Sequence, residues 1–191
     1  MSGERVVVII GSPTAERDAD GGHRASGLAV RVARGLVQHG ERVELIGRVG
    51  ADSIGDEAIL SLARDGISHV ALLRDPSLVT PVSSAFSGIA IDAGDAQLGL
   101  RYLTNFAVVL LIDPLDASVV QQVAEDAAYV GAQMIVVADG AQVVEGTLQL
   151  PVAGGGSPPP LLIPRPSVES AEFDALLVAL ASSGESVETS V

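Results

Sequence analysis

Several carboxylates of this sequence directly follow apolar runs, where they are placed to take a proton from a bound substrate. Asp113 follows the run 106–112, and Asp139 follows the run 133–138. If these runs are parallel strands, both carboxylates stand at the strand ends where open α/β sheets bind ligands. Asp113 is the better candidate for a general base. An Asp ahead of Pro114 is also a typical helix cap, and both interpretations stay open.

Asp52 lies in a glycine-rich stretch, GERVELIGRVGADSIGDEAILSLARDGI at 40–67. Glycines let the backbone pass close to neighbouring strands, and an Asp in such a turn accepts hydrogen bonds from the amides that follow it. The stretch predicts a buried strand, a tight turn and a capped amphipathic helix, which is the start of a ligand-binding α/β unit. Asp52 is therefore either a structural cap or a ligand contact.

Other chemistries are excluded by composition. The chain has no Cys and no Lys, which rules out disulfides, thiolate nucleophiles, lysine Schiff bases and a lysine-dependent P-loop. The three histidines, at 23, 39 and 69, are too far apart to suggest a metal site. We expect no bound metal from the protein's own residues.

The charge balance is strongly acidic, with a formal net charge of −13 and Arg as the only basic residue apart from histidine. Such a field repels phosphate backbones and anionic lipid, and the arginines form no run in the sequence. We therefore expect no nucleic-acid or membrane partner. The apolar run after Glu4 is too short for a signal peptide or a membrane span, so a cytoplasmic protein is predicted.

The elements that must position these residues follow an α/β pattern. Five aromatic residues and 48% apolar content indicate an aliphatic core of the kind found around parallel strands. Apolar periodicity and glycine stops predict strands at 6–10, 42–47, 70–73, 106–112, 133–138 and 161–163, and helices at 25–39, 53–65, 117–130 and 167–181. The polar segment 13–24 and the segment AGGGSPPP at 153–160 are predicted as loops.

Two segments are predicted to depart from this alternation. Residues 82–92 alternate small or polar with apolar side chains and indicate a half-exposed antiparallel strand, a lid or edge, ending in a turn at 93–95. Residues 143–150 suggest one arm of a hairpin. We predict one domain over 1–181, with 82–95 as its lid or edge strand, and a flexible tail at 182–191.

Residues 27–67 resemble the ribokinase-like, or PfkB, carbohydrate and nucleoside kinases. That family has a helix ending in Leu-Gly, a strand, a G-x-V-G-x-D-x-x-G turn, and a helix closing in Gly-Val or Gly-Ile. Here the turn is matched by five residues, Gly47, Val49, Gly50, Asp52 and Gly55, and the helix end by Asp65, Gly66 and Ile67. The resemblance implies a three-layer αβα, Rossmann-like fold with a mostly parallel central sheet and a reduced β lid.

The same resemblance implies where a sugar would bind. The family's Gly-Gly-x-x-x-Asn segment begins at Gly27, so that its second Gly falls on Leu28 and its Asn on Arg31. Glu16 or Asp18 stands where the family carries an early sugar-binding Asp. The substrate-binding candidates are therefore Glu16, Asp18, Gly27, Arg31 and Asp52.

The C-terminal part, 134–181, is similar to the end of the family's core, where a D-T-x-G-A-G-D-x-F motif opens a helix. Matching Phe173 to the family's Phe places Val168, Glu169 and Ser170 at the anion hole and Ala171 at the catalytic Asp. Ala171 cannot accept a proton, and Glu169 would put a negative charge where a phosphate is held. In a second alignment, 164–169 stands for a mid-chain N-x-x-E segment, and the catalytic Asp is again absent.

Three functions follow from these observations. The first is a degenerate ribokinase-like protein without phosphotransferase activity, which binds a sugar- or nucleoside-type metabolite or a protein partner and needs no cofactor. The second is a divergent kinase that uses ATP and Mg²⁺, with Asp113, Asp139 or Glu169 as its base. The third is a structural subunit that dimerises through 82–92. The first is our prediction, and a dimer through that edge is compatible with it.

Overall fold

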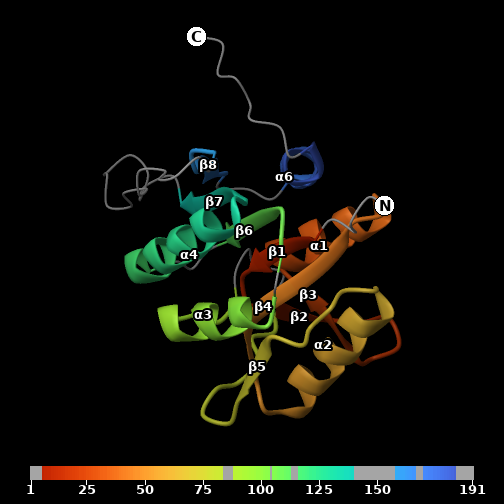
Figure 1. The fold of residues 1–191 in the computed structure, drawn as a ribbon. Coiled ribbons are helices and arrows are strands. Elements are labelled where there is room, and N and C mark those ends of the chain that lie inside the picture. The colour runs from red at the N-terminus through yellow and green to blue at the C-terminus, as the bar shows by residue number, and fades with distance from the viewer. Residues whose placement is uncertain are drawn as a thin grey trace.

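The computed structural model describes residues 6–83, 88–103, 105–112, 116–139, 158–166 and 170–183. A six-stranded sheet crosses the molecule in the order β5-β4-β1-β6-β7-β8, and every neighbouring pair is parallel (Figure 1). The strands are β1 (Val6–Ile10), β4 (Arg42–Gly50), β5 (Leu72–Asp75), β6 (Val108–Ile112), β7 (Gln133–Asp139) and β8 (Leu161–Arg165). A mostly parallel sheet flanked by helices confirms the predicted α/β fold.

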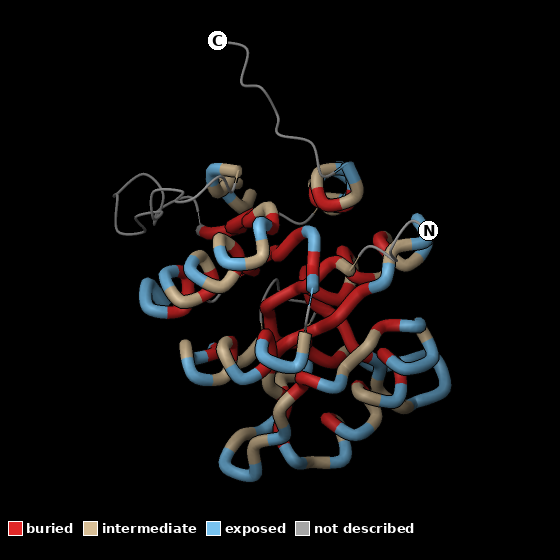
Figure 2. The backbone as a smooth tube through the Cα atoms, viewed as in Figure 1, coloured by how far each residue is buried: buried red, intermediate tan, exposed pale blue. Residues whose placement is uncertain are grey.

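Two helical layers cover the sheet. One face packs against α1 (Leu28–Gln38) and α6 (Ala171–Ser183), and the other against α3 (Ala93–Arg101) and α4 (Ala117–Val130). A fifth helix, α2 (Ser53–Arg64), lies against the antiparallel hairpin formed by β2 (Thr14–Arg17) and β3 (His23–Ser26). The inner strands β4, β1, β6 and β7 are buried along most of their length (Figure 2). This arrangement explains why the strand sequences are nearly continuous apolar runs.

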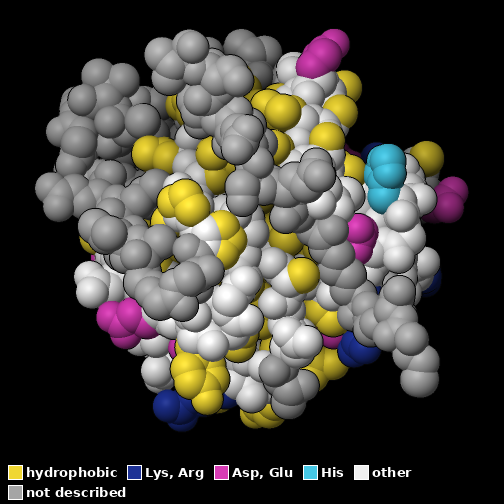
Figure 3. Space-filling model, turned by 45° about the horizontal axis from the view of Figure 1, so that its top comes forward, with side chains coloured by type: hydrophobic (Ala, Val, Ile, Leu, Met, Phe, Trp, Pro, Cys, Tyr) yellow, Lys and Arg dark blue, Asp and Glu magenta, His cyan; other side chains and the backbone are white. Residues whose placement is uncertain are grey.

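The sheet ends at β8, whose only strand neighbour among the described residues is β7. Four of its five residues are half-buried and Pro164 is exposed, whereas β6 is fully buried. Figure 3 turns this end of the molecule toward the viewer, and hydrophobic side chains are visible in places on it. No helix in the described ranges has both the length and the apolar content needed to cross a membrane.

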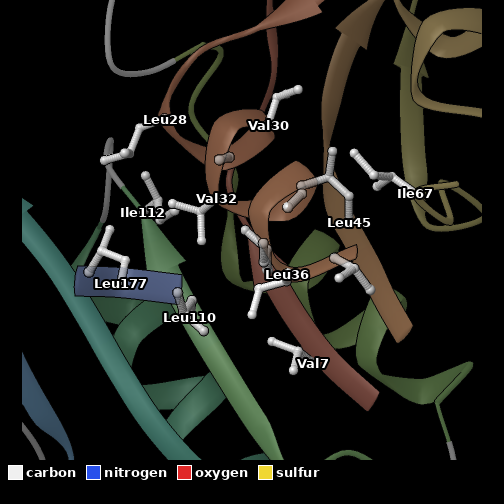
Figure 4. Packing of buried hydrophobic residues seen from close by; sticks show 14 of the residues in the cluster. Val7, Leu28, Val30, Val32, Leu36, Leu45, Ile67, Leu110, Ile112 and Leu177 are labelled. Atoms are coloured by element: carbon white, nitrogen blue, oxygen red, sulfur yellow. The ribbon is translucent and has the colours of Figure 1, made fainter. Parts of the chain in front are cut away.

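Alternation along the strands divides the core into two clusters. On β6, Val108, Leu110 and Ile112 face α1 and α6, and Val109 and Leu111 face α3 and α4. Figure 4 shows the first cluster, where Leu28, Val32 and Leu36 of α1 point toward strand side chains such as Val7 and Leu110. The i, i+4 spacing of the helix residues explains their shared face.

The predicted loop at 13–24 was wrong, because β2 and β3 form a hairpin there. Four residues on each side pair antiparallel, from Thr14 opposite Ser26 to Arg17 opposite His23. The two strands are short, and the charged residues in their outer halves are typical of a loop sequence. Gly21, with a φ of 85°, supplies the left-handed conformation at the tip.

The predicted strand at 82–92 and turn at 93–95 were also wrong where the structure describes them. Val82 forms one isolated parallel bridge with Ala15, and residues 88–92 form no strand. Residues 93–95 are the first turn of α3, capped by the Asp92 side chain, which accepts from Asp95 N at 2.9 Å. Glycines at 94 and 99 made this helix resemble a turn.

The other elements lie close to their predicted positions. Strand β4 runs three residues further than predicted, to Gly50, and β5 begins two residues later, at Leu72. The last helix begins at Ala171 rather than at residue 167. The predicted hairpin arm at 143–150 lies outside the described residues, as do 153–157 of the predicted loop and 184–191 of the predicted tail.

Candidate functional site at the carboxyl edge of the sheet

The carboxyl ends of all six parallel strands lie along one edge of the sheet. Gly11 follows β1 there, and its amide donates to Ile46 O at 2.9 Å. Helix α6 starts at this edge, because it returns from the end of β8, and α1 starts near it, after the hairpin that follows β1. The residues predicted from the sequence therefore belong mostly to one end of the molecule, which is where open parallel sheets bind ligands.

The turn after β4 is held by a cluster of four residues, Gly50, Asp52, Gly55 and Thr80, here called the Thr80 cluster. The Asp52 carboxylate accepts from Gly55 N at 2.7 Å, from Thr80 N at 2.8 Å and from Thr80 Oγ1 at 2.9 Å. The Thr80 hydroxyl oxygen accepts in turn from Gly50 N at 3.0 Å. Donation from the Thr80 amide, and then from the Gly55 amide, holds the pKa of Asp52 below its usual value.

Close approach of the backbone explains the glycines of this turn. A Cβ at Gly50 would lie 2.6 Å from Leu78 O and 2.7 Å from Thr80 N. A Cβ at Gly55 would lie 2.9 Å from Thr80 Oγ1 and still closer to Gly50 O. The G-x-V-G-x-D-x-x-G spacing thus joins β4, α2 and the segment around Thr80, and the described contacts of Asp52 are with the chain's own backbone and Thr80.

The first turns of α1 and α6 are joined by an ion pair. Gly27 precedes α1 with a φ of 94°, a conformation that other residues rarely adopt. One turn further on, Arg31 Nε donates to Asp174 Oδ2 at 2.7 Å, and both side chains are about three-quarters buried. The cation at the family's Asn position is therefore compensated by a carboxylate that the sequence analysis did not identify.

The N-terminus of α6 carries the position predicted for a catalytic base. Ala171 is the first residue of the helix and is exposed, and the hydroxyl oxygen of Ser170 accepts from Phe173 N at 3.1 Å. Of the predicted anion-hole positions, Val168 and Glu169 lie outside the described residues, as does Asp113. Asp139 is the last residue of β7.

Glu16 and Asp18 lie on the β2–β3 hairpin. Glu16 Oε1 forms an ion pair of 2.8 Å with Arg24 on the opposite strand. Asp18 is exposed at the start of the tip, where its amide donates to Gly22 O at 2.8 Å. The contacts described for these two residues are thus within the hairpin, whereas Arg31 pairs with Asp174.

Arg48 and Thr80 were not among the residues predicted from the sequence. Arg48 follows Gly47 on β4 and forms ion pairs with Asp92, at 2.8 Å, and with Asp95, which fastens β4 to the start of α3. Burial lowers the pKa of Arg48, but the hydrogen bond and charge of Asp95, with the charges of Asp92 and Asp75, give a net rise. Neither partner was predictable, because 28 residues separate Asp52 from Thr80 and 44 separate Arg48 from Asp92.

Buried hydroxyls add polarity near the end of β1. The Ser12 side chain accepts from Arg48 N at 2.9 Å, and Thr14 is fully buried. Within the described ranges, no three His, Asp or Glu side chains gather in a way that could hold a metal ion.

Comparisons with known proteins give similarity of structure only. No family model and no curated protein sequence matches the chain. A carbohydrate kinase from Agrobacterium tumefaciens superposes with a TM-score of 0.57 and 15% identity, over 74% of this chain and 56% of the kinase. A fructokinase from Xylella fastidiosa gives 0.57 and 14%, over 70% of this chain and 50% of the fructokinase.

A third neighbour, 2-dehydro-3-deoxygluconokinase from Thermotoga maritima, gives a TM-score of 0.54 and 15% identity, over 70% of this chain and 50% of that one. The chain thus spans about half the length of the solved structures that it matches. Sequence identities this low support a shared fold and no further similarity. The six-stranded parallel sheet between two helical layers is accordingly a ribokinase-like fold, shared with sugar kinases.

Proposed function

We propose that this protein is a ribokinase-like carbohydrate kinase homologue that binds a sugar- or nucleoside-type metabolite without transferring phosphate to it. The observation that carries the proposal is the start of α6. In the resemblance drawn from the sequence, the catalytic Asp falls on Ala171, the exposed first residue of that helix. A methyl group accepts no proton, and a lost general base costs roughly 10²- to 10⁴-fold in rate.

Two contacts around Ala171 support the same conclusion. The Ser170 hydroxyl accepts from the Phe173 amide, one of the first-turn amides that a helix N-terminus otherwise offers to an anion. Of the two carboxylates in the first turn of the helix, Glu172 is exposed and Asp174 pairs with Arg31. A carboxylate held by a guanidinium is a poorer base, because the positive charge favours its ionised form.

A coupled assay of ADP release, with Mg²⁺ and a panel of sugars and nucleosides, tests the loss of phosphate transfer. We expect turnover that no added sugar or nucleoside increases. A thermal-shift screen of the same compounds tests binding, since a ligand at 100 times its Kd stabilises the folded state by about 2.7 kcal/mol. Sugar-dependent ADP release would refute the loss of transfer, and a panel without any stabilising compound would refute the metabolite site.

A divergent kinase that uses ATP and Mg²⁺ is the second candidate, and the ends of two central strands favour it. Strand β6 ends at Ile112, directly before Asp113 in the sequence, and β7 ends with Asp139 at the carboxyl edge of the sheet. In this case Asp113→Asn or Asp139→Asn abolishes sugar-dependent ADP release. Titration calorimetry that detects no binding of ATP with Mg²⁺ would exclude this function.

A further inference from the structure

Between Ala175 and Ala181, helix α6 is apolar on the side that faces solvent as well as on the side that faces the core, and the exposed Glu172 and Ser183 flank this stretch. Leu177, Val178 and Ala181 are buried against α1 and the sheet. On the opposite side, Ala175, Leu176 and Ala179 are exposed, and Leu176 retains 46% of its accessible surface. Surface helices usually place polar residues there, so a helix that is apolar all round is typical of one that is covered.

Four further apolar side chains of the same core cluster are only partly buried. Phe173 and Leu180, on the flank of the helix, are only partly buried, and so are Leu161 and Ile163 of β8. We call Phe173, Ala175, Leu176, Ala179 and Leu180 the α6 patch. In Figure 3, hydrophobic side chains are visible where α6 comes forward. An extended apolar patch on a protein surface marks an interaction site.

The distribution of charge indicates which kind of partner binds the α6 patch. Helix α6 has no charged residue after Asp174, a run of nine residues to Ser183, although the chain carries a formal charge of −13. A basic partner attracted by that charge would contact the acidic surfaces instead. Two copies of the chain repel each other at their acidic surfaces. Contact through an uncharged surface therefore has the lowest electrostatic cost.

We propose that the α6 patch is the contact between two copies of this chain. A two-fold axis would bring the same helix from each copy together in antiparallel orientation, so that every contact occurs twice. Ala175 and Ala179 lie one turn apart and allow the two helix backbones to approach closely. Leu176 of one copy then packs over the small residues of the other. This contact differs from one formed through residues 82–92.

Sedimentation velocity of the full chain across a range of concentrations tests the proposal. We expect a species of twice 19.4 kDa whose population rises with concentration. Leu176→Glu introduces a charge at the centre of the patch and is expected to weaken the dimer at least about tenfold. Raising the salt concentration should preserve or strengthen the dimer, because no ion pair crosses the patch and salt screens the mutual repulsion.

Two control variants make the experiment specific. Leu98→Glu alters a leucine of almost equal exposure on α3, 44% against 46%, and should leave the dimer intact. Val82→Glu alters the segment that pairs with β2 and should also leave it intact. Circular dichroism establishes that each variant is folded. A wild-type protein that stays monomeric, or a dimer lost in Val82→Glu and kept in Leu176→Glu, would overturn the proposal.

Discussion

Replacing Asp52 by Ala should destabilise the protein more than removal of an ordinary helix cap. Asp52 caps α2 through Gly55 N, which alone is worth about 1 kcal/mol. Its carboxylate also accepts from the amide and hydroxyl of Thr80. Hydrogen bonds to a charged group contribute roughly 1.5–3 kcal/mol, and we take about 1–2 kcal/mol for this pair because water reaches the partly exposed carboxylate. The expected total is about 2–3 kcal/mol.

Asp116 provides the matched control. It caps α4 and is exposed, and among the described residues it accepts from Ser118 alone, through the amide at 2.9 Å and the hydroxyl at 3.0 Å. Asp116→Ala should therefore cost about 1 kcal/mol. Urea unfolding of both variants at pH 7 gives the comparison. Equal losses in Asp52→Ala and Asp116→Ala would refute the role assigned to Thr80.

The effect of pH follows from the lowered pKa of Asp52. The ordinary value is 3.8, and the folded protein holds the pKa lower through the amides of Thr80 and Gly55. The unfolded state therefore takes up the proton first, and the stabilisation is complete above the unfolded pKa and is lost as pH falls through the folded one. The difference in stability between wild type and Asp52→Asn should thus be constant from pH 7 to about 5 and shrink below pH 4. A constant difference down to pH 2 would refute the reasoning.

Three further experiments test how the helices pack around the sheet. Gly55→Ala should cost about 1–3 kcal/mol in urea unfolding, because its Cβ meets backbone oxygen, and an unchanged midpoint would contradict that close approach. In a double-mutant cycle with Arg31→Ala and Asp174→Ala, we expect a coupling energy of about 1 kcal/mol, between the values typical of exposed and buried ion pairs. Additive losses of stability would show that the ion pair does not stabilise the fold. Gly35→Ala should destabilise the protein, since its Cβ would lie 2.6 Å from a methyl carbon of Val178. Adding Val178→Ala should relieve that clash. A Gly35→Ala variant as stable as wild type would show that α1 and α6 can move apart.

The central sheet was predictable because its strands are long apolar runs. Residues 6–10 and 106–112 are bounded by polar residues or glycine and contain little else but Val, Leu and Ile. Such strands are buried on both faces, so composition alone identifies them. Helix α4 was equally clear, because its apolar residues recur at helical spacing before Gly131.

Elements at the periphery were not predictable in the same way. The β2–β3 hairpin is stabilised by α2 through contacts distant in sequence, such as Ala25 N to Ser61 Oγ at 2.8 Å, and no local pattern encodes them. Helix α3 has glycines at 94 and 99, and Gly99 is there because a Cβ would lie 2.7 Å from a side-chain carbon of Ile46. Tertiary packing, which a single sequence does not display, overrides local propensity in both cases.

The candidate site was predictable in its glycines and in Asp52, and not in its partners. The G-x-V-G-x-D-x-x-G spacing located the turn, but the residue that completes it, Thr80, belongs to a segment with no distinguishing pattern. Likewise Arg31 was noticed as a departure from the family, and its partner Asp174 lies 143 residues away. The residues of one turn can be predicted from the local sequence, whereas the residues that contact them from distant parts of the chain cannot.

The place of β1 in the sheet has a consequence for how the chain is made. This first strand lies between β4 and β6, so its second neighbour begins only at Val108. At ribosomal rates of about 5–20 residues per second, close to a hundred residues separate the two strands by roughly 5–20 s of synthesis. Both edges of the run VVVII are unpaired until β4 is made, and one edge stays unpaired until β6 follows, so its pairing with β6 must close a long loop. Nascent chains should therefore be most prone to aggregate, and most dependent on chaperones, before β6 has left the ribosome.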